Sequence, residues 1–566
     1  MGIKRGLLII CLFSLLVSNS CGKRVAYPEK LDIPIVSLNT LKKESPSEED
    51  LKTWHFKDVF IDTIPGISLN KAYGLLGHMV PDTIIVAVLD MSIDIEHEDL
   101  AHSIWYNARE IPSNGLDDDN NGYVDDVNGW NFIGWTNNRS SQFVNYEYTR
   151  ILRKFDPIFK GKEREEIAKQ LLWDYEQYKR AEEAFKEQMT YAEWESNNAQ
   201  ALTNLGKDNK ALLSKYFPSS DFTIGKLDSL SAIFKEDANL QDAIEFRKEL
   251  VQYGVLEKDI IEGQLKADER INKLLNLEYN DRKPLEDLYP DDLNYNKYGN
   301  NIVNYNTTLL DHGTLVAGVI AANRENEIGA KGVTNAVKIM PLSISAFGDE
   351  HDKDLALAIR YAVDNGARII NISSGKTFSM HPKLVQNAIE YAAIKDVLIV
   401  TSAGNDGLNL DKVGNYNFPN DTDLKAEEIS DNFIKVGSVT HKVGKDLFDI
   451  YSNYGKREVD IFAPGKEIYT TSPNQDNYSF ESGTSFAAPM VAGVAALIFS
   501  YYPHLSAEEV KKIILETGIE YKMYVNISKD EEQPKLVPFV TLCKSGKVIN
   551  AYYALKLAEL LNGKKL

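Results

Sequence analysis

The sequence predicts an α/β fold with three layers, in which helices flank a mainly parallel central sheet and an α-helical subdomain is inserted. Three observations support this. Short apolar runs at 84–89, 370–372 and 399–402 are each followed by polar or glycine-containing turns. Small-residue helical stretches follow His312 and Ser485. Residues 141–300 form a charged stretch that is poor in glycine and proline. Strands that alternate with helices favour a parallel sheet.

Composition indicates a globular protein with a sizeable core. The chain has 566 residues, 43% of them hydrophobic and 10% aromatic, which allows one large domain with embellishments or several domains. Its formal charge is −20 and its pI is near 5.1. Proteins that bind nucleic acid need clustered positive charge, so we expect no nucleic-acid partner.

The N-terminus has the layout of a secretory signal. Lys4 and Arg5 precede an apolar run over 7–17, and small polar residues lead to Cys21. The run is short for a membrane span, and no other segment resembles one. Residues 1–20 are therefore predicted to be a signal peptide, similar to that of a bacterial lipoprotein, with Cys21 as the candidate lipidation site. Ser18 stands where that motif usually has leucine, so ordinary cleavage beside an incidental cysteine is the alternative.

The cysteine count favours the lipoprotein interpretation. Cys11 leaves with the signal and an acylated Cys21 cannot pair, so Cys543 remains alone and no disulfide framework exists. We expect an exported protein of the bacterial cell envelope that contacts the membrane only through a lipid anchor.

Three separate segments carry residues with catalytic chemistry. Asp90 ends an apolar strand, where α/β proteins often place functional groups, although a strand-end aspartate also caps turns. His312 precedes a small-residue helix, and a lone histidine there would more often be structural. Ser485 opens an apolar helix, which fits either an N-terminal cap or a nucleophile near the positive end of the helix dipole.

Together these segments resemble the subtilisin-like serine peptidases. Asp90, His312 and Ser485 follow one another in the order known for subtilisin. The strings "VAVLDMSID", "DHGTLVAG", "SAGNDG" and "GTSFAAPMVAG" resemble that family over about residues 60–140 and 300–556. The resemblance implies a subtilisin-like α/β fold and a serine endopeptidase that cleaves peptides or proteins without a catalytic cofactor.

The resemblance also implies a role for each residue. His312 would accept the proton of the Ser485 hydroxyl, and Asp90 would orient the imidazole and stabilise its charged form. Asn405 and the backbone N–H of Ser485 would bind the oxyanion. Ser373, Ser374 and Gly375 would pair with the substrate backbone as an added strand.

The sequence departs from the family pattern at three places. Met91 and Ser92 follow Asp90, where the family usually has Ser or Thr and then Gly, which puts the turn geometry in question. Leu315 and Met490 stand where histidines are frequent. None of these departures removes Asp90, His312 or Ser485.

His312 follows Asp90 by 222 positions, and this gap holds a predicted helical insertion at about 141–300. Apolar residues recur every three or four positions, at Ile167, Leu171, Tyr175, Tyr178, Ala181 and Phe185, and again at Leu240, Ala243, Ile244, Leu250 and Val251. Gly254 is a predicted helix end. We expect these faces to pack helix against helix, with a binding groove as the alternative, and the insertion to restrict access to the cleft.

The rest of the chain is predicted to form an N-terminal extension and a peptidase domain that the insertion interrupts. Residues 21–80 are an N-terminal extension unlike the family's folded inhibitory propeptide, and 81–140 with 301–566 make up the peptidase domain. Residues 537–561 are predicted to supply its last strand, turn and helix.

An acidic loop predicts structural calcium. Asp117, Asp119, Asn121, Tyr123 (through its carbonyl) and Asp125 follow the ligand order of an EF-hand-type loop, although position twelve is Asn128 instead of glutamate. The alternative is a solvated turn without metal. The family resemblance adds a second candidate calcium site at Asp99 and Asn326.

Two other functions compete with an active peptidase. One is a catalytically impaired, subtilisin-like scaffold whose insertion recruits a partner. The complete set of Asp90, His312, Ser485 and Asn405 argues against it. The other is an esterase with convergent chemistry, which is disfavoured because no G-x-S-x-G elbow surrounds Ser485.

Overall fold

A computed structural model describes residues 31–37, 47–135, 137–285, 298–422, 427–473, 477–530 and 532–565. The predicted signal peptide and Cys21 lie outside the described residues, so both stay predictions.

The core of the protein is a nine-stranded sheet with the order β10-β13-β7-β6-β5-β4-β1-β3-β2. Every neighbouring pair is parallel except β10 with β13. The strands are β1 (Ile84–Asp90), β2 (Trp130–Asn131), β3 (Val337–Ser343), β4 (Ile369–Ile372), β5 (Leu398–Ser402), β6 (Phe433–Val439), β7 (Ile461–Pro464), β10 (Ile519–Glu520) and β13 (Lys547–Val548).

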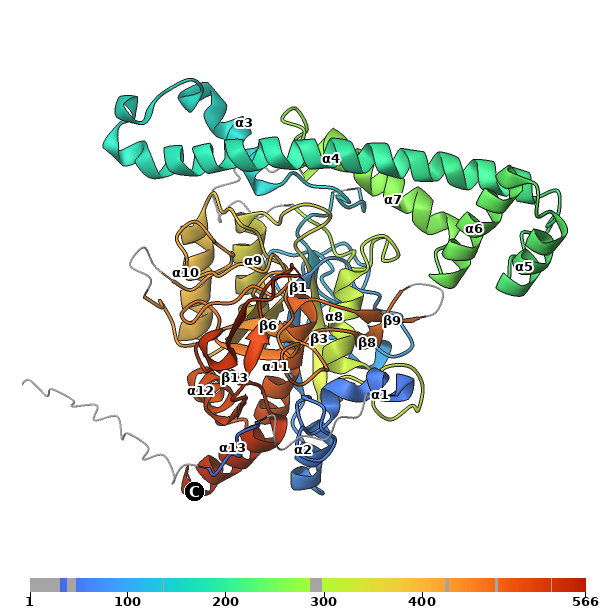
Figure 1. Cartoon of the computed structure of the whole chain (residues 1–566). Coiled ribbons are helices and arrows are strands. Elements are labelled where there is room, and N and C mark those ends of the chain that lie inside the picture. Colours follow the sequence, from blue (N-terminus) through green and yellow to red (C-terminus); the bar gives the residue numbers. More distant parts are fainter. Residues whose placement is uncertain are drawn as a thin grey trace, which may run out of the picture.

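Helices cover both faces of this sheet (Figure 1). Side chains alternate along a strand, so Val86 and Val88 of β1 join one core cluster and Ala87 and Leu89 join another. The first cluster packs on α8 (His312–Ala321), α11 (Thr484–Tyr501), α12 (Ala507–Thr517) and α13 (Ala551–Lys565). The second packs on α9 (Asp352–Asp364) and α10 (Pro382–Ile394). The three-layer α/β prediction is confirmed.

Small side chains allow the central helix α11 to pack closely in the core. Within the described chain it is the one helix long and apolar enough to cross a membrane, but 89% of that 18-residue window is buried inside the protein. Its Ala and Val residues pack against β4, β5, β6 and β7 and against α8. The hydrophobicity of α11 therefore reflects its central position in the core.

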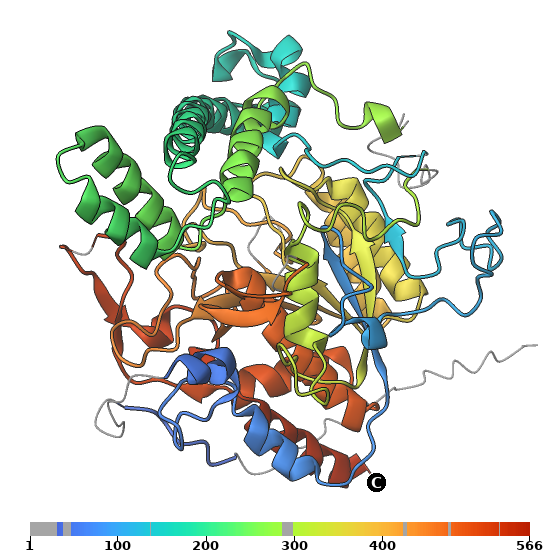
Figure 2. The ribbon, with the colours of Figure 1, turned by 90° about the vertical axis from the view of Figure 1, so that its right-hand side faces the viewer.

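The insertion forms a helical subdomain whose main element is a 42-residue helix. Its helices are α3 (Glu147–Phe159), α4 (Leu172–Leu213), α5 (Ile224–Ile233), α6 (Ala238–Gln252) and α7 (Glu257–Glu269), followed by the π-helical turn η6 (Arg270–Leu274). In Figure 1, α4 lies across one end of the sheet domain, and α5 and α6 lie beside the C-terminal end of α4. The same arrangement is visible after a 90° turn in Figure 2.

The apolar faces of the insertion pack helix against helix, as predicted. Tyr175, Tyr178 and Ala181 of α4 are buried together with Phe159 of α3. Leu240, Ile244 and Leu250 of α6 are also buried, and Gly254 adopts a left-handed φ of +66° just after the helix. One part of the prediction is wrong, because Ile167 and Leu171 precede α4 instead of lying on it.

The N-terminal extension packs onto the peptidase domain. It contains α1 (Glu48–Thr53), the short turn η2 (Trp54–Phe56) and α2 (Leu69–Leu76). Trp54 and Ile67 are fully buried in the same cluster as α11, and the N–H of Val36 donates to the carbonyl of Glu520. The extension is therefore part of the main core.

The other elements are short. The two-stranded sheets are β8 (Ile468–Thr471) with β9 (Tyr478–Glu481), and β11 (Tyr524–Asn526) with β12 (Leu536–Pro538). Short 3-10 turns are η3 (Ala101–Ser103), η4 (Arg164–Glu166), η5 (Lys169–Leu171), η7 (Lys283–Leu285) and η8 (Phe539–Thr541).

Candidate active site

Asp90 and His312 meet at the carboxyl-terminal edge of the parallel sheet. Asp90 is the last residue of β1 and His312 is the first residue of α8. The Nδ1 atom of His312 lies 2.7 Å from Oδ1 of Asp90, which also accepts the N–H of Met91. Asp90 is buried with 1% of its surface exposed, so its carboxylate holds the imidazole in one orientation.

The charges around His312 favour its protonated form. Burial opposes a charge on the imidazole, but the carboxylate of Asp90, with smaller contributions from Asp311 and Glu481, raises the pKa of His312 above its usual value. The side chain keeps 28% of its surface exposed, so Nε2 can reach a substrate.

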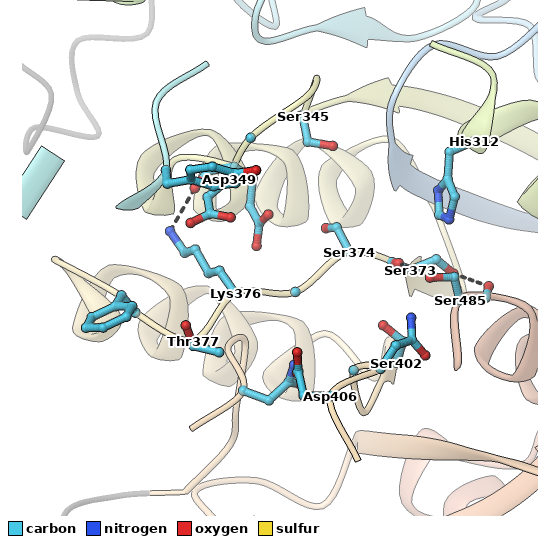
Figure 3. Close-up of a pocket in the computed structure, with 18 of the residues that line it drawn as sticks. His312, Ser345, Asp349, Ser373, Ser374, Lys376, Thr377, Ser402, Asp406 and Ser485 are labelled. Atoms are coloured by element: carbon cyan, nitrogen blue, oxygen red, sulfur yellow. Dashed lines mark hydrogen bonds between the residues drawn. The ribbon is translucent and has the colours of Figure 1, made fainter. Parts of the chain in front are cut away.

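Ser485 lies in the first turn of α11, but it does not cap the helix. Gly483 is the N-cap residue, and no side chain makes the capping hydrogen bond. The Ser485 hydroxyl donates to the carbonyl of Ser373 at 2.8 Å, and the Ser373 hydroxyl donates to the carbonyl of Ser485 at 2.8 Å. The capping interpretation of Ser485 is therefore wrong. Figure 3 shows the His312 ring directed toward Ser485.

Asn405 is held with its amide nitrogen free to donate. Its Oδ1 atom accepts the backbone N–H of Thr484 at 2.9 Å and the Thr484 hydroxyl at 3.0 Å. A backbone N–H can donate only to the amide oxygen, so this contact assigns Oδ1 and Nδ2 of the Asn405 side chain. Asn405 and Ser485 line the same cavity, at the start of α11.

The proposed catalytic residues line one cavity of about 540 Å³ together with Asn405 and residues 373–375. The segment 373–375 directly follows β4, and the carboxyl ends of β4 and β5 are neighbours in the sheet. Figure 3 shows Ser373, Ser374, His312 and Ser485 around this space. The structure thus brings together every catalytic and substrate-binding residue that the sequence predicted.

The insertion supplies part of the same cavity wall, through residues that the sequence analysis did not assign to the site. The residues concerned are Tyr146, Tyr148, Ala184, Gln188 and Arg270. Arg180 of α4 also stacks on Phe378 and Tyr416, with its guanidinium carbon 4.6 Å from each ring centre. No local pattern marks these residues, and none of them belongs to the helical spacing identified in the sequence.

A buried ionic cluster surrounds Lys376, which follows the segment 373–375. The ammonium group of Lys376 is 2.8 Å from Oδ1 of Asp352 and 3.5 Å from Oε1 of Glu147, and it donates to the carbonyl of Glu350 at 2.7 Å. Burial raises the pKa of Glu350 to about 7, against the opposing effect of Lys376. Burial lowers the pKa of Lys376, but Asp352 and Glu147 outweigh it and the net shift is upward.

The departures from the family pattern leave this geometry in place. Neither Met91 nor Ser92 has a positive φ, so the turn after Asp90 needs no glycine. The Ser92 hydroxyl donates to the carbonyl of Tyr305, which fixes the turn. Leu315 and Met490 are buried in the core cluster around α11.

The acidic loop places its carboxylates in two groups. Asp117 accepts the backbone N–H groups of Asn121 and Gly122, and Asp125 accepts those of Asn114 and Gly115. The second group is Glu110, Asp119 and Asp126, whose carboxylate oxygens lie within 4.8 Å of one another.

The loop's remaining predicted ligands bind within the loop. The Asn121 amide donates to Asp126, and its oxygen accepts the N–H of Tyr123. Sequence reasoning did not assign Glu110 and Asp126 as ligands. Glu110 lies outside the EF-hand-type spacing, and only the folding of the loop brings it to Asp119.

Arg109, whose guanidinium lies 3.1 Å from Asp119, offsets part of the negative charge of the second group, and the remaining charge fits a cation. Burial, together with neighbouring carboxylates, raises the pKa of both Glu110 and Asp126. Oε2 of Glu110 is buried without a hydrogen-bond partner. Buried carboxylates that lack partners are costly unless a cation or a proton neutralises them.

The structure also brings Asp99 and Asn326 together, because the Asn326 amide donates to Oδ1 of Asp99. Burial raises the pKa of Asp99, and its other oxygen has no hydrogen-bond partner. The oxygen of the same amide accepts the N–H of Ile328, so the amide nitrogen and not the oxygen faces Asp99 in this structure.

A parallel α/β sheet with a carboxylate, an imidazole and a serine hydroxyl at one edge is the architecture of a serine hydrolase. A sequence model of the subtilase family matches residues 82–537, and the chain belongs to this family of serine peptidases.

Individual relatives agree with this assignment. The chain is 33% identical to the cell wall-associated protease of Bacillus subtilis (strain 168), over 46% of this chain and 28% of that protein. It is 37% identical to the thermophilic serine proteinase of Bacillus sp. (strain AK1), over 34% of this chain and 43% of that protein. Subtilisin DY of Bacillus licheniformis is 33% identical, over 38% of this chain and 72% of that protein.

Solved structures also match. One is the prenylagaramide maturation protease PagA, which is 27% identical over 44% of this chain and 82% of that chain, with a TM-score of 0.35. The matched region spans less than half of the length of the first two relatives named above.

Proposed function

We propose that this protein is an exported serine endopeptidase that hydrolyses peptide bonds with Asp90, His312 and Ser485. The observation that carries the proposal is the Asp90–His312 contact of 2.7 Å in the same cavity as Ser485 and Asn405. Peptides or proteins are the partners, and no nucleic acid is expected because the chain carries a net charge of −20.

The first step requires a rotation of the Ser485 side chain. Its hydroxyl leaves the carbonyl of Ser373 and turns toward Nε2 of His312, which takes the proton as Oγ attacks the substrate carbonyl. Catalytic hydrogen bonds are often formed only with substrate bound. Asp90 keeps the proton of His312 on Nδ1 and stabilises the imidazolium that results.

Two donors would bind the oxyanion formed by this attack. Thr484 donates to Oδ1 of Asn405 and so orients the Nδ2 group, and the N–H of Ser485 lies at the positive end of α11. His312 then gives its proton to the leaving amine, and water hydrolyses the acyl-enzyme by the same steps. The backbone of residues 373–375 binds the substrate as an added strand, which depends little on substrate sequence.

A fluorophosphonate probe tests this proposal directly. Wild-type protein without residues 1–20 should be labelled and should cleave an unfolded protein, whereas Ser485→Ala should do neither while keeping its circular dichroism spectrum. Ser482→Ala is the matched control, because the Ser482 hydroxyl accepts the N–H of Glu467 away from the triad. Absence of labelling of the wild type under several activating conditions would favour the alternative, a subtilisin-like scaffold that binds a partner.

We further propose that the protein is anchored to the bacterial envelope through Cys21. Support comes from the charged and apolar layout of residues 1–20 and from relatives that include a cell wall-associated protease. Metabolic labelling with a palmitate analogue tests this, with Cys21→Ala as the variant that should lose the label. A wild type without the label would favour ordinary signal cleavage.

We also propose structural calcium, with no cofactor for catalysis. Glu110, Asp119 and Asp126 would hold one ion, with oxygens of the loop 117–125 nearby. Asp99 and Asn326 would contribute to a second site. A bound cation would offset the burial and the neighbouring negative charge that raise the pKa values of Glu110 and Asp126.

A further inference from the structure

Residues 74–80 form an exposed apolar tip at the lower end of the molecule in Figure 1. The tip comprises the last turn of α2 and the loop that follows it, with the sequence GLLGHMV. Val80 is 90% exposed and Met79 is 45% exposed, and Leu75 is exposed as well. The protein carries a formal charge of −20, but residues 72–81 contain no Asp, Glu, Lys or Arg. The tip is therefore an apolar surface on an otherwise acidic protein.

The base of the tip is fixed in the protein core. On the inner face of α2, Ala72 and Leu76 are buried in the same cluster as α11. The Tyr73 hydroxyl donates to the carbonyl of Val333 at 2.8 Å, and α13 packs beside α2. The position of the tip is thus set by the core, while its own apolar side chains stay outside the core.

The tip and the proposed nucleophile lie at opposite ends of α11. Ser485 is in the first turn of this helix. The carbonyl of Ser500, in its last turn, accepts the N–H of Asp82 at 2.7 Å, two residues beyond the tip. A helix rises 1.5 Å per residue, so residues 485 and 500 are about 22 Å apart. In Figure 1 the insertion helix α4 lies across the other end of the molecule. The cleft and the tip therefore face in opposite directions.

The chain that leads to the predicted lipid anchor enters the structure at the same end as the tip. Residues 31–37 lie beside α13 in Figure 1, and Leu31 packs against the core cluster that contains α2 and α13. Cys21 is ten residues earlier, and ten residues of fully extended chain span at most about 33–36 Å. Residues 22–30 contain three basic residues and one acidic residue, which an anionic lipid surface attracts. An acylated Cys21 would therefore hold the bilayer close to the lower end of the protein.

We propose that the 74–80 tip inserts into the surface of the bilayer to which Cys21 is anchored, so that the cleft faces away from the membrane. The proposal rests on the proposed lipid anchor and adds a second membrane contact, whereas the sequence indicated the anchor alone. A single acyl chain binds a membrane only marginally, and a second signal makes the attachment stable. Substrates then reach the cleft from the aqueous side.

The test couples the chain from residue 21 onward to vesicles of phosphatidylethanolamine and phosphatidylglycerol. The thiol of Cys21 reacts with a maleimide on a lipid headgroup, while Cys543 is completely buried and does not compete. This tether forms whether or not a cell acylates Cys21. Hydrogen–deuterium exchange of the backbone then reports the contact and needs no catalysis, so an inactive enzyme would not obscure the result.

Exchange over residues 74–80 should be slower on the vesicles than in solution. Burial of one large apolar side chain changes an equilibrium constant by about 10-fold or more, so we expect exchange to slow by about that factor. The variant Met79→Glu/Val80→Glu should remove most of the slowing, because a carboxylate is costly to transfer into apolar surroundings.

The matched control is Ile233→Glu, which changes an exposed apolar residue away from the tip. Ile233 is 72% exposed at the end of α5 in the insertion, and this variant should keep the slow exchange over 74–80. Both variants alter exposed side chains, so both should keep the melting temperature of the wild type. That measurement distinguishes a loss of membrane contact from a folding defect.

Three outcomes would overturn the proposal. The first is equal exchange over 74–80 on vesicles and in solution, and the second is slowing that Met79→Glu/Val80→Glu leaves intact. The third is slowing that appears without vesicles as the protein concentration rises, which would assign the tip to contact with a second copy of the chain. Palmitate-analogue labelling of Cys21 in cells tests the anchor separately. If that labelling fails while the coupled protein shows slow exchange, the anchor is wrong and the affinity of the tip for lipid stands.

Discussion

Glu147, in the first turn of the insertion's helix α3, lies 3.5 Å from the ammonium group of Lys376, which directly follows the proposed substrate-binding segment 373–375. Both side chains are almost completely buried. Arg150 forms a further ion pair with Glu147 and donates to the carbonyls of Asn145 and Asp349. The insertion and the edge of the cleft therefore share one buried network of charges.

Breaking this network from one side should destabilise the protein. Lys376→Met leaves Asp352 buried without its cation and Glu147 paired with Arg150 alone, which should lower the free energy of unfolding by about 3–5 kcal/mol. The double variant Lys376→Met/Glu147→Gln should recover part of the loss. Chemical denaturation measures both, with the exposed Lys383→Met as a control. A single variant as stable as the wild type would contradict this prediction.

The same network predicts how stability depends on acid. Burial would raise the pKa of Glu147, but Arg150 and Lys376 hold it well below its usual value. A lowered pKa stabilises the folded state above the unfolded value of about 4.5, and this stability is lost as the pH falls through the folded pKa. Denaturation at pH 7 and at pH 3 should show a smaller acid loss in Glu147→Gln than in the wild type.

Asp90→Asn should lower the pKa of His312 and reduce kcat. Because the pKa of His312 is raised in the folded protein, its protonated form stabilises the folded state at pH values below the usual histidine pKa. This contribution to stability is lost as the pH rises through the pKa of His312 in the folded protein. A general base must be neutral, so the acidic limb of kcat/KM against pH should move to lower pH in Asp90→Asn. We expect kcat to fall by as much as about 10⁴-fold. A pH profile identical to that of the wild type would contradict the role of Asp90.

Asn405→Ala should reduce kcat with little effect on KM, because the amide binds the oxyanion that exists only after attack. The expected loss is about 10²–10³-fold, the magnitude measured when the corresponding asparagine is removed from subtilisin. Thr484 also loses the acceptor at Oδ1 of Asn405, so thermal unfolding should be measured in parallel. A rise in KM at constant kcat would mean that Asn405 binds the ground state instead.

Calcium should raise the melting temperature relative to chelator, because a ligand that binds only the folded state stabilises it. The variants Glu110→Gln and Asp126→Asn should abolish most of this difference. Asp228→Asn, on α5 at the far end of the insertion, is the control and should keep it. If the wild type melts identically in both buffers, neither candidate site is a structural calcium site.

Removal of the outer insertion should make the cleft more accessible. Gly206 of α4 and Ile260 of α7 are adjacent, so a short Gly/Ser linker can replace residues 207–258 while Tyr146, Gln188 and Arg270 remain in the cavity wall. We expect cleavage of folded proteins to rise relative to cleavage of short peptides. An unchanged ratio would mean that the outer insertion docks a partner or stabilises the fold, and does not restrict access.

The sequence was sufficient for the fold class and for the identity of the proposed catalytic residues. Apolar strands and small-residue helices are local patterns, and Asp90, His312 and Ser485 each sit at the end or start of such an element. The same local patterns could not exclude the capping role of Ser485. That question was decided by the hydrogen bond of its hydroxyl to Ser373, which is 112 positions away.

What the sequence determined by itself is the chemistry available to this protein, because residue type, order and periodicity are properties of the chain. Only the tertiary structure decided which side chains share a space. Asn417 and Arg270 reach the wall of the cavity that contains Ser485, and Glu110 joins Asp126, through contacts that no local pattern encodes. The physical reason is that burial, charge pairing and steric contact depend on distances between atoms, and distant parts of the chain acquire those distances only when the core packs.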